Sequence, residues 1–136
     1  MRKRRKKMNH SEAIEKLVQG MMYFSESEYP FVLEQWKGLS DASLREKILI
    51  AHPEAGSLEE VPPASFFEKI IRNLRLGHDA YSLQMADRYK ALQEYIRDNF
   101  SSSMVYRCGK IRVGIYIVIP ETAQDYIVLR STSVET

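Results

Sequence analysis

Hydrophobic positions alternate most regularly near the C-terminal end of the chain. From Ile111 to Ile119 every second residue is Ile or Val, which predicts a half-buried β-strand. The residues between them become less polar toward Val118, so we expect the second face of this strand to be partly covered. Shorter strand-like runs at 104–107 and 126–134 flank it, the first separated from it by a predicted tight turn at Cys108–Gly109. Three strands with short connections predict an antiparallel meander.

Helical spacing of apolar residues dominates the first hundred positions. It predicts helices over residues 9–22, 40–50, about 65–76 and 79–99, with a strand at 31–36 and a loop at 54–63. Asn9 with Glu12, and Ser65 with Glu68, have the spacing of capping boxes at helix N-termini. Gly77 predicts a helix end, and Asp79 is a suitable N-cap for the longest helix. Helices followed by a strand meander predict the α+β class.

Composition narrows the class of protein. The chain has 136 residues, 44% apolar and 28% charged, as is ordinary for one soluble globular domain with a real core. Its one cysteine, Cys108, excludes an internal disulfide framework and any multi-cysteine metal site. We expect it to be a buried structural thiol. The sequence contains no run long enough to cross a membrane.

The N-terminus carries six consecutive basic residues, Arg2 to Lys7. We expect residues 1–8 to form a disordered basic arm and residues 9–136 to form a single domain. Such a block suggests contact with nucleic acid or an anionic surface, or it is simply solvated. Without the arm the balance is 14 basic against 18 acidic residues, so the predicted domain is mildly acidic. An acidic domain favours a basic protein partner over direct binding of nucleic acid.

The most unusual local stretch runs from Tyr23 to Phe31, where aromatic residues and a proline flank Ser25-Glu26-Ser27-Glu28. Serine hydroxyls in such a turn can satisfy nearby backbone groups, which would stiffen the turn and orient Glu26 or Glu28. The alternative is an ordinary turn between a helix and a strand, with solvated glutamates.

The chain stops almost directly after its last predicted strand, at Val134-Glu135-Thr136. An anchored strand would hold the terminal carboxylate, the Glu135 side chain and the Thr136 hydroxyl at a defined place. These oxygens could imitate a phosphate or approach a metal held by a partner. The alternative is a loose, solvated terminus.

The sequence contains little that indicates catalysis. The three histidines show no close metal-ligand spacing, and no glycine-rich phosphate loop or nucleophile elbow is present. Cys108 has no evident base beside it. We therefore predict no enzyme, no catalytic residue, no metal site of its own and no cofactor. The patterns by themselves give an α+β domain without a function.

Three segments together resemble a known family. Ser25-Glu26-Ser27-Glu28-Tyr29-Pro30-Phe31, the run Val105-Tyr106-Arg107-Cys108-Gly109, and the terminal Val134-Glu135-Thr136 are similar in sequence, order and separation to the nuclease A inhibitor family. Ser65-Phe66-Phe67 in the middle also fits. The resemblance covers Met8 to Thr136; it is strong at residues 23–31 and 104–136 and weak from about 37 to 100.

This resemblance implies a three-layer α/β/α sandwich with a central antiparallel sheet. It implies a stoichiometric, bacterial and cytoplasmic protein inhibitor of a magnesium-dependent, sugar-nonspecific ββα-metal endonuclease, acting as a monomer. In such inhibitors the terminal threonine reaches the nuclease's metal region, and the first glutamate of the serine-glutamate turn engages an active-site arginine. Those roles fall to Thr136 and Glu26, and we expect Ser25, Glu28 and Glu135 to belong to the same nuclease-binding surface.

Two features depart from the family pattern. The family's third contact is an acidic residue followed by tryptophan before the long helix, whereas Asn73 to Asp79 contains no tryptophan and carries Arg75. That contact is therefore not transferred. The Arg2–Lys7 arm has no counterpart in the pattern, and it supports a second hypothesis: a non-inhibitory module that binds protein or nucleic acid through the arm.

Overall fold

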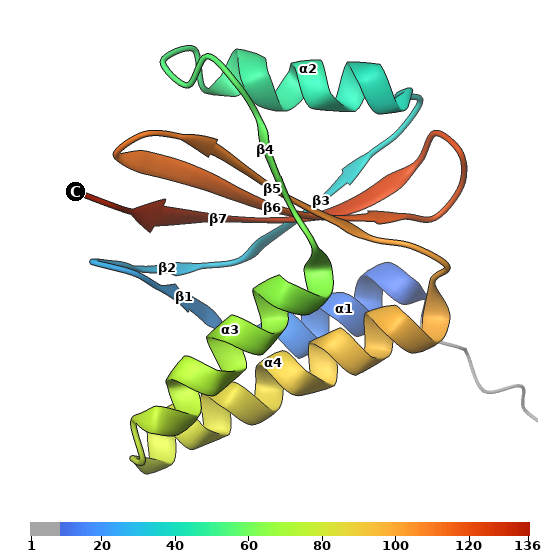
Figure 1. Cartoon of the computed structure of the whole chain (residues 1–136). Coiled ribbons are helices and arrows are strands. Elements are labelled where there is room, and N and C mark those ends of the chain that lie inside the picture. Colours follow the sequence, from blue (N-terminus) through green and yellow to red (C-terminus); the bar gives the residue numbers. More distant parts are fainter. Residues whose placement is uncertain (1–8) are drawn as a thin grey trace, which may run out of the picture.

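Helices cover both faces of a central antiparallel sheet in this computed structural model, which describes residues 9–136 (Figure 1). Within these residues the helices are α1 (His10–Val18), α2 (Asp41–Ala51), α3 (Pro63–Leu76) and α4 (Ala80–Asn99). The strands are β1 (Met22–Phe24), β2 (Glu28–Pro30), β3 (Val32–Trp36), β4 (Glu59–Val61), β5 (Met104–Gly109), β6 (Arg112–Pro120) and β7 (Tyr126–Val134). The predicted α+β class and three-layer α/β/α sandwich are confirmed. The Arg2–Lys7 arm lies outside the described residues.

The main sheet has the strand order β3-β7-β6-β5-β4, and every neighbouring pair is antiparallel. β5, β6 and β7 form the predicted meander. β1 and β2 form a separate hairpin, in which Phe24 pairs with Glu28 across the turn.

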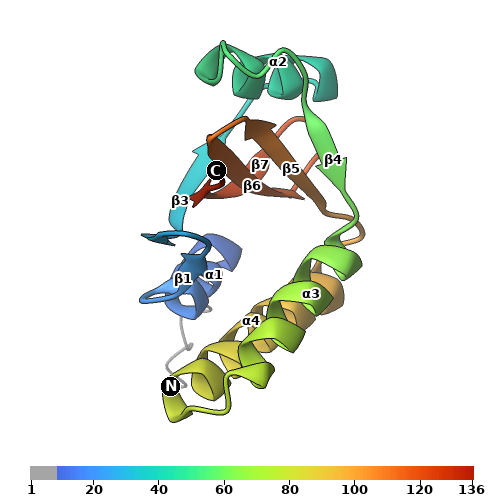
Figure 2. The same ribbon diagram turned by 60° about the vertical axis from the view of Figure 1, so that its left-hand side comes forward.

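The central strand β6 is buried on both of its faces, which separates two hydrophobic cores. Ile115 and Ile117 pack with residues of α1, α3 and α4 on one side. Tyr116 and Val118 pack with Leu44 and other residues around α2 on the other side. Figure 2 shows α2 alone on its side of the sheet. The prediction that the second face is covered is confirmed, and the cover is nearly complete.

The predicted turn at Cys108–Gly109 is wrong, because β5 continues through both residues. Cys108 pairs with Gly114 and Gly109 pairs with Val113, so three residues, Lys110 to Arg112, connect this last pair, and Lys110 and Ile111 lie outside both strands. Cys108 is buried in the α2-side core, as expected for a structural thiol, and burial raises its pKa. Because Cys108 stays within β5, its side chain fills space in the core on the α2 side of the sheet. Ile111 is consequently 62% exposed and is not part of β6.

Two helix boundaries differ from the prediction. α1 ends at Val18 instead of residue 22, because Gly20 adopts a positive φ of 78° and the chain turns into β1. α3 begins at Pro63, two residues before the predicted capping box at Ser65, and no side chain caps it. Proline fits the first helical turn, where its missing N–H has no partner to lose. The predicted N-caps Asn9 and Asp79 are confirmed.

Strand β4 lies inside the predicted loop 54–63. It is short, two of its three residues are glutamates, and it pairs on one side only, with β5. Charged, short edge strands resist further pairing and carry little hydrophobic signal. None of the helices in residues 9–136 combines the length and apolar character that crossing a bilayer requires.

Gly109 supports the β5–β6 turn, and its replacement tests that geometry. Its φ is 129°, and an added Cβ would overlap the Arg112 carbonyl oxygen. Gly38 also has a positive φ, of 70°, but nothing lies within 4 Å of an added Cβ. We expect Gly38→Ala to lower the free energy of unfolding by about 1–2 kcal/mol, the ordinary cost of a left-handed conformation. Gly109→Ala should cost about 1–3 kcal/mol more, because backbone must move. Urea denaturation of both variants measures the difference; equal losses would contradict the steric argument.

Candidate functional site

Three segments that are distant in sequence meet at one end of the molecule: the turn between β1 and β2, the turn between β5 and β6, and the end of β7 (Figure 1). We call residues 25–28 the serine-glutamate turn and residues 134–136 the C-terminal segment. Pairing of Arg112 with Val134 carries the end of β7 back beside the start of β6. The Glu135 N–H then donates to the Ile111 carbonyl at 2.8 Å. The segment is therefore held by the sheet on one side.

Ser25 joins the serine-glutamate turn to the C-terminal segment. Its hydroxyl accepts hydrogen bonds from the N–H of Val134 at 2.9 Å and of Ser27 at 3.3 Å, and donates to the Ser27 carbonyl at 3.2 Å. These contacts use the one donor and both acceptor positions of a serine hydroxyl. The Glu26 N–H adds a bond of 3.3 Å to the Val134 carbonyl. These hydrogen bonds to the backbone of Val134 thus hold the serine-glutamate turn against the end of β7.

Glu26 binds Thr136 directly. Its carboxylate accepts from the Thr136 N–H at 2.8 Å and from the Thr136 hydroxyl, whose oxygen lies 2.7 and 2.8 Å from the two carboxylate oxygens. Both residues are exposed. A carboxylate offers about four lone-pair positions, so Glu26 retains acceptor capacity toward a partner while it holds Thr136. The two residues identified from sequence are therefore brought together in one exposed group.

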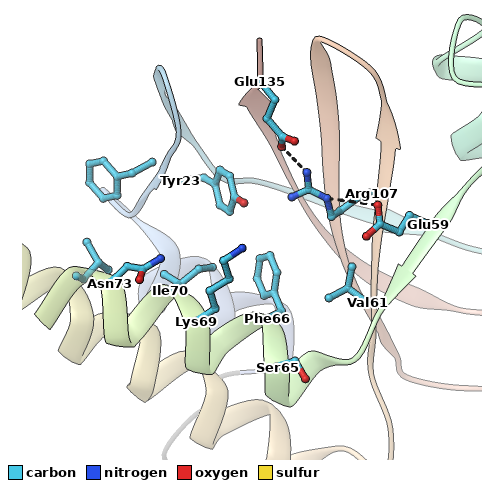
Figure 3. A pocket seen from close by; sticks show the side chains of 12 residues that line it. Tyr23, Glu59, Val61, Ser65, Phe66, Lys69, Ile70, Asn73, Arg107 and Glu135 are labelled. Atoms are coloured by element: carbon cyan, nitrogen blue, oxygen red, sulfur yellow. Dashed lines mark hydrogen bonds and ion pairs between the residues drawn. The ribbon is translucent and has the colours of Figure 1, made fainter. Parts of the chain in front are cut away.

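Glu135 faces the opposite way from that group and is bound internally. Its carboxylate accepts from the Ser133 hydroxyl at 2.7 Å and forms an ion pair with Arg107, which also lies 3.9 Å from Glu59 (Figure 3). Burial acts to raise the pKa of the Glu135 carboxyl, but the hydrogen bonds from Ser133 and Arg107 outweigh it, and the pKa is lowered. Glu135 is therefore held in its ionised form as an internal anchor.

Arg107 is a residue of the site that the sequence reasoning did not assign. Its sequence position could have indicated this role, because Arg107 lies two residues after Val105 in β5. The two side chains therefore share the face that turns toward the core of α1, α3 and α4. A charged side chain on such a face requires a partner of opposite charge. Its guanidinium side chain is only 22% exposed. The sequence contains no indication of which carboxylate that partner is.

Glu28 and the segment Asn73–Asp79 lie nearby but are not joined to this network. Glu28 is exposed in β2, and within residues 9–136 its side chain makes no hydrogen bond or ion pair. Asn73 belongs to the last turn of α3, and the corner beyond it exposes Leu76 by 67% and Tyr81 by 52%. The corner therefore offers apolar surface where the family pattern has an acidic residue followed by tryptophan.

Comparison with known proteins gives the family of the chain. No curated protein matches the chain significantly. A family model described as nuclease A inhibitor-like protein matches residues 8–136, nearly the entire chain. That description points to a general role as a nuclease inhibitor, with a nuclease as protein partner. The chain belongs to the nuclease A inhibitor-like protein family.

Proposed function

We propose that this protein is a stoichiometric inhibitor of a magnesium-dependent, sugar-nonspecific ββα-metal endonuclease, and that it occupies the nuclease active site with the C-terminal segment and the serine-glutamate turn. The observation that carries the proposal is the bond between Glu26 and Thr136, which joins the two segments into one exposed acidic group. Family membership supports the general role of nuclease inhibition.

The chemistry of a nuclease site suits such a group. Enzymes that cleave phosphodiesters gather cations and metal around the phosphate, because negative charge develops there in the transition state. The Glu26 carboxylate would pair with a guanidinium of the nuclease, and the Thr136 oxygens would turn toward its metal. Charge-assisted hydrogen bonds of this kind are among the strongest in proteins.

Order in the free protein makes the contact effective. A flexible terminal residue loses conformational freedom on binding, which weakens affinity. Here Thr136 is already held through its N–H and its hydroxyl, and Val134 is held by Ser25. The geometry presented to the nuclease therefore exists before the encounter.

The remaining candidates take supporting roles in this proposal. Ser25 fixes the turn and Glu135 fixes the strand end through Arg107, so both act as anchors. Glu28 lies on the same hairpin and supplies acidic surface near the contact. Inhibition by occupancy assigns no catalytic residue and no cofactor to this chain. We propose that it acts in the cytoplasm of the producing cell.

Removing either central residue tests the mechanism. We expect Glu26→Gln and deletion of Thr136 each to weaken nuclease binding by about 2 kcal/mol or more, roughly 30-fold in Kd, because a desolvated charge pair or a metal-directed contact is lost. Glu121→Gln is the matched control, since Glu121 is an exposed glutamate in the loop between β6 and β7, at the other end of the sheet. Titration into a nonspecific magnesium-dependent endonuclease that degrades plasmid DNA provides the readout.

The double variant refines this test. Because Glu26 and Thr136 are in contact, we expect the two losses to be non-additive in a double-mutant cycle. Full inhibition near equal stoichiometry by both single variants would contradict the proposed mechanism. Inhibition by none of the proteins, including the unaltered chain, would contradict the proposed function itself.

The anchoring role of Arg107 generates a separate pH-dependent prediction. Because the pKa of Glu135 is lower in the folded state, the pair stabilises the fold above the ordinary glutamate pKa, and this contribution is lost as the pH falls through the folded-state pKa. We expect Arg107→Gln to lower the free energy of unfolding by roughly 1 kcal/mol at neutral pH, since Glu135 is partly exposed and solvent screens the pair. The difference should vanish in acid. Arg112→Gln, an exposed residue of β6, serves as control. Urea denaturation from neutral pH into acid measures the stability of both variants. If the loss caused by Arg107→Gln does not depend on pH, the Arg107–Glu135 ion pair does not anchor the C-terminal segment.

A further inference from the structure

A cavity of about 670 Å³ lies between α3, β1, β4 and β5, beside the C-terminal segment (Figure 3). This volume falls within the range of small-molecule sites in proteins, roughly 300–1,000 Å³. Its apolar wall consists of Tyr23, Phe24, Val61, Phe66, Ile70 and Leu74. The cavity is distinct from the exposed Glu26–Thr136 group, although Glu135 borders it.

Two aromatic side chains define the shape of the cavity. Tyr23 comes from β1 and Phe66 from α3, and their rings are nearly parallel, with an interplanar angle of 6° and centroids 6.1 Å apart. The two rings stack with each other, and aromatic side chains also pack favourably against a further aromatic ring. Burial raises the pKa of the Tyr23 phenol, whose hydroxyl lies near Arg107, so the phenol stays neutral over the physiological range. The wall therefore suits an aromatic group better than a second charge.

The charged side chains that line the cavity indicate which ligand charge it favours. Arg107 is engaged by Glu135 and, at 3.9 Å, by Glu59, whose side chain is 68% exposed at the rim. Lys69 extends from α3 toward the cavity in Figure 3, and within residues 9–136 it forms no ion pair. An ammonium that forms no direct ion pair and lies beside an apolar wall can bind one carboxylate.

We propose that this cavity binds a small aromatic carboxylic acid, with its carboxylate on Lys69 and its ring against Tyr23 and Phe66. This inference goes beyond the proposed inhibition, because it assigns a small-molecule ligand to a cavity that borders the anchor residues Arg107 and Glu135 but is separate from the exposed Glu26–Thr136 group. Lys69 also acts electrostatically on Glu135.

The proposal is tested by titrating the isolated protein with 1-naphthoate and following backbone amide signals by NMR. We expect saturable binding with the largest shifts at Tyr23, Phe66, Ile70 and Glu135. The neutral analogue 1-naphthalenemethanol has nearly the same shape and lacks the charge. It should bind at least about tenfold more weakly, because it cannot form the charge-assisted bond to Lys69.

Two variants separate charge from shape. Lys69→Met keeps most of the side-chain volume and should weaken naphthoate binding by at least about tenfold. Lys90→Met, on the exposed face of α4, is the matched control and should leave binding unchanged. Ile70→Trp retains Lys69 but fills the space, and should abolish binding. Unfolding curves establish that each variant folds.

Three outcomes would overturn the proposal: equal affinity for the acid and the alcohol, unchanged binding by Lys69→Met, or no saturable shifts at the cavity of the unaltered protein. The titration contains no nuclease, so its result is independent of whether the protein inhibits one. A protein that inhibits a nuclease but does not bind naphthoate would refute the ligand site alone.

Discussion

The antiparallel pairing of β6 with β7 is the interaction on which the other features depend. It helps place β6 in the middle of the sheet, and the apolar side chains on both faces of β6 are buried by helices on both sides. It also returns the end of the chain to the start of β6, where Glu135 bonds to Ile111. The same register that produces the three layers therefore places the C-terminal segment. A slip of one residue would exchange the two faces of β7 and move its last side chains away from their partners.

The residues of the site fall into two groups according to what their side chains bind. All four residues are exposed, but the side chains of Ser25 and Glu135 bond to other parts of the chain, whereas those of Glu26 and Thr136 bond to each other. The contacts of Ser25 and Glu135 hold the two segments in place, and the Glu26–Thr136 pair presents the polar groups that we propose bind the nuclease. This arrangement resembles the supporting shell of an active site, although it is built to occupy a site on another molecule.

Strong periodic patterns made much of the fold predictable. The alternation in β6, the N-caps Asn9 and Asp79, and the length of α4 all emerged from local sequence. β4 did not, because two glutamates in a three-residue edge strand resemble a loop until β5 is beside them. Glu26 and Thr136 could be selected through family resemblance, but their mutual bond could not, since it depends on tertiary structure. The role proposed for Lys69 could not be predicted from the sequence, because only the cavity distinguishes this residue from any other lysine on a helix surface.

The Glu26–Thr136 bond joins residues 110 positions apart in the sequence. Closing so long a loop costs entropy that is recovered only when the intervening sheet has formed. The exposed acidic group therefore forms only when the β1–β2 hairpin and the end of β7 lie together. A chain that lacks either segment cannot form this bond, so the bond requires that the two ends of the domain are folded against each other.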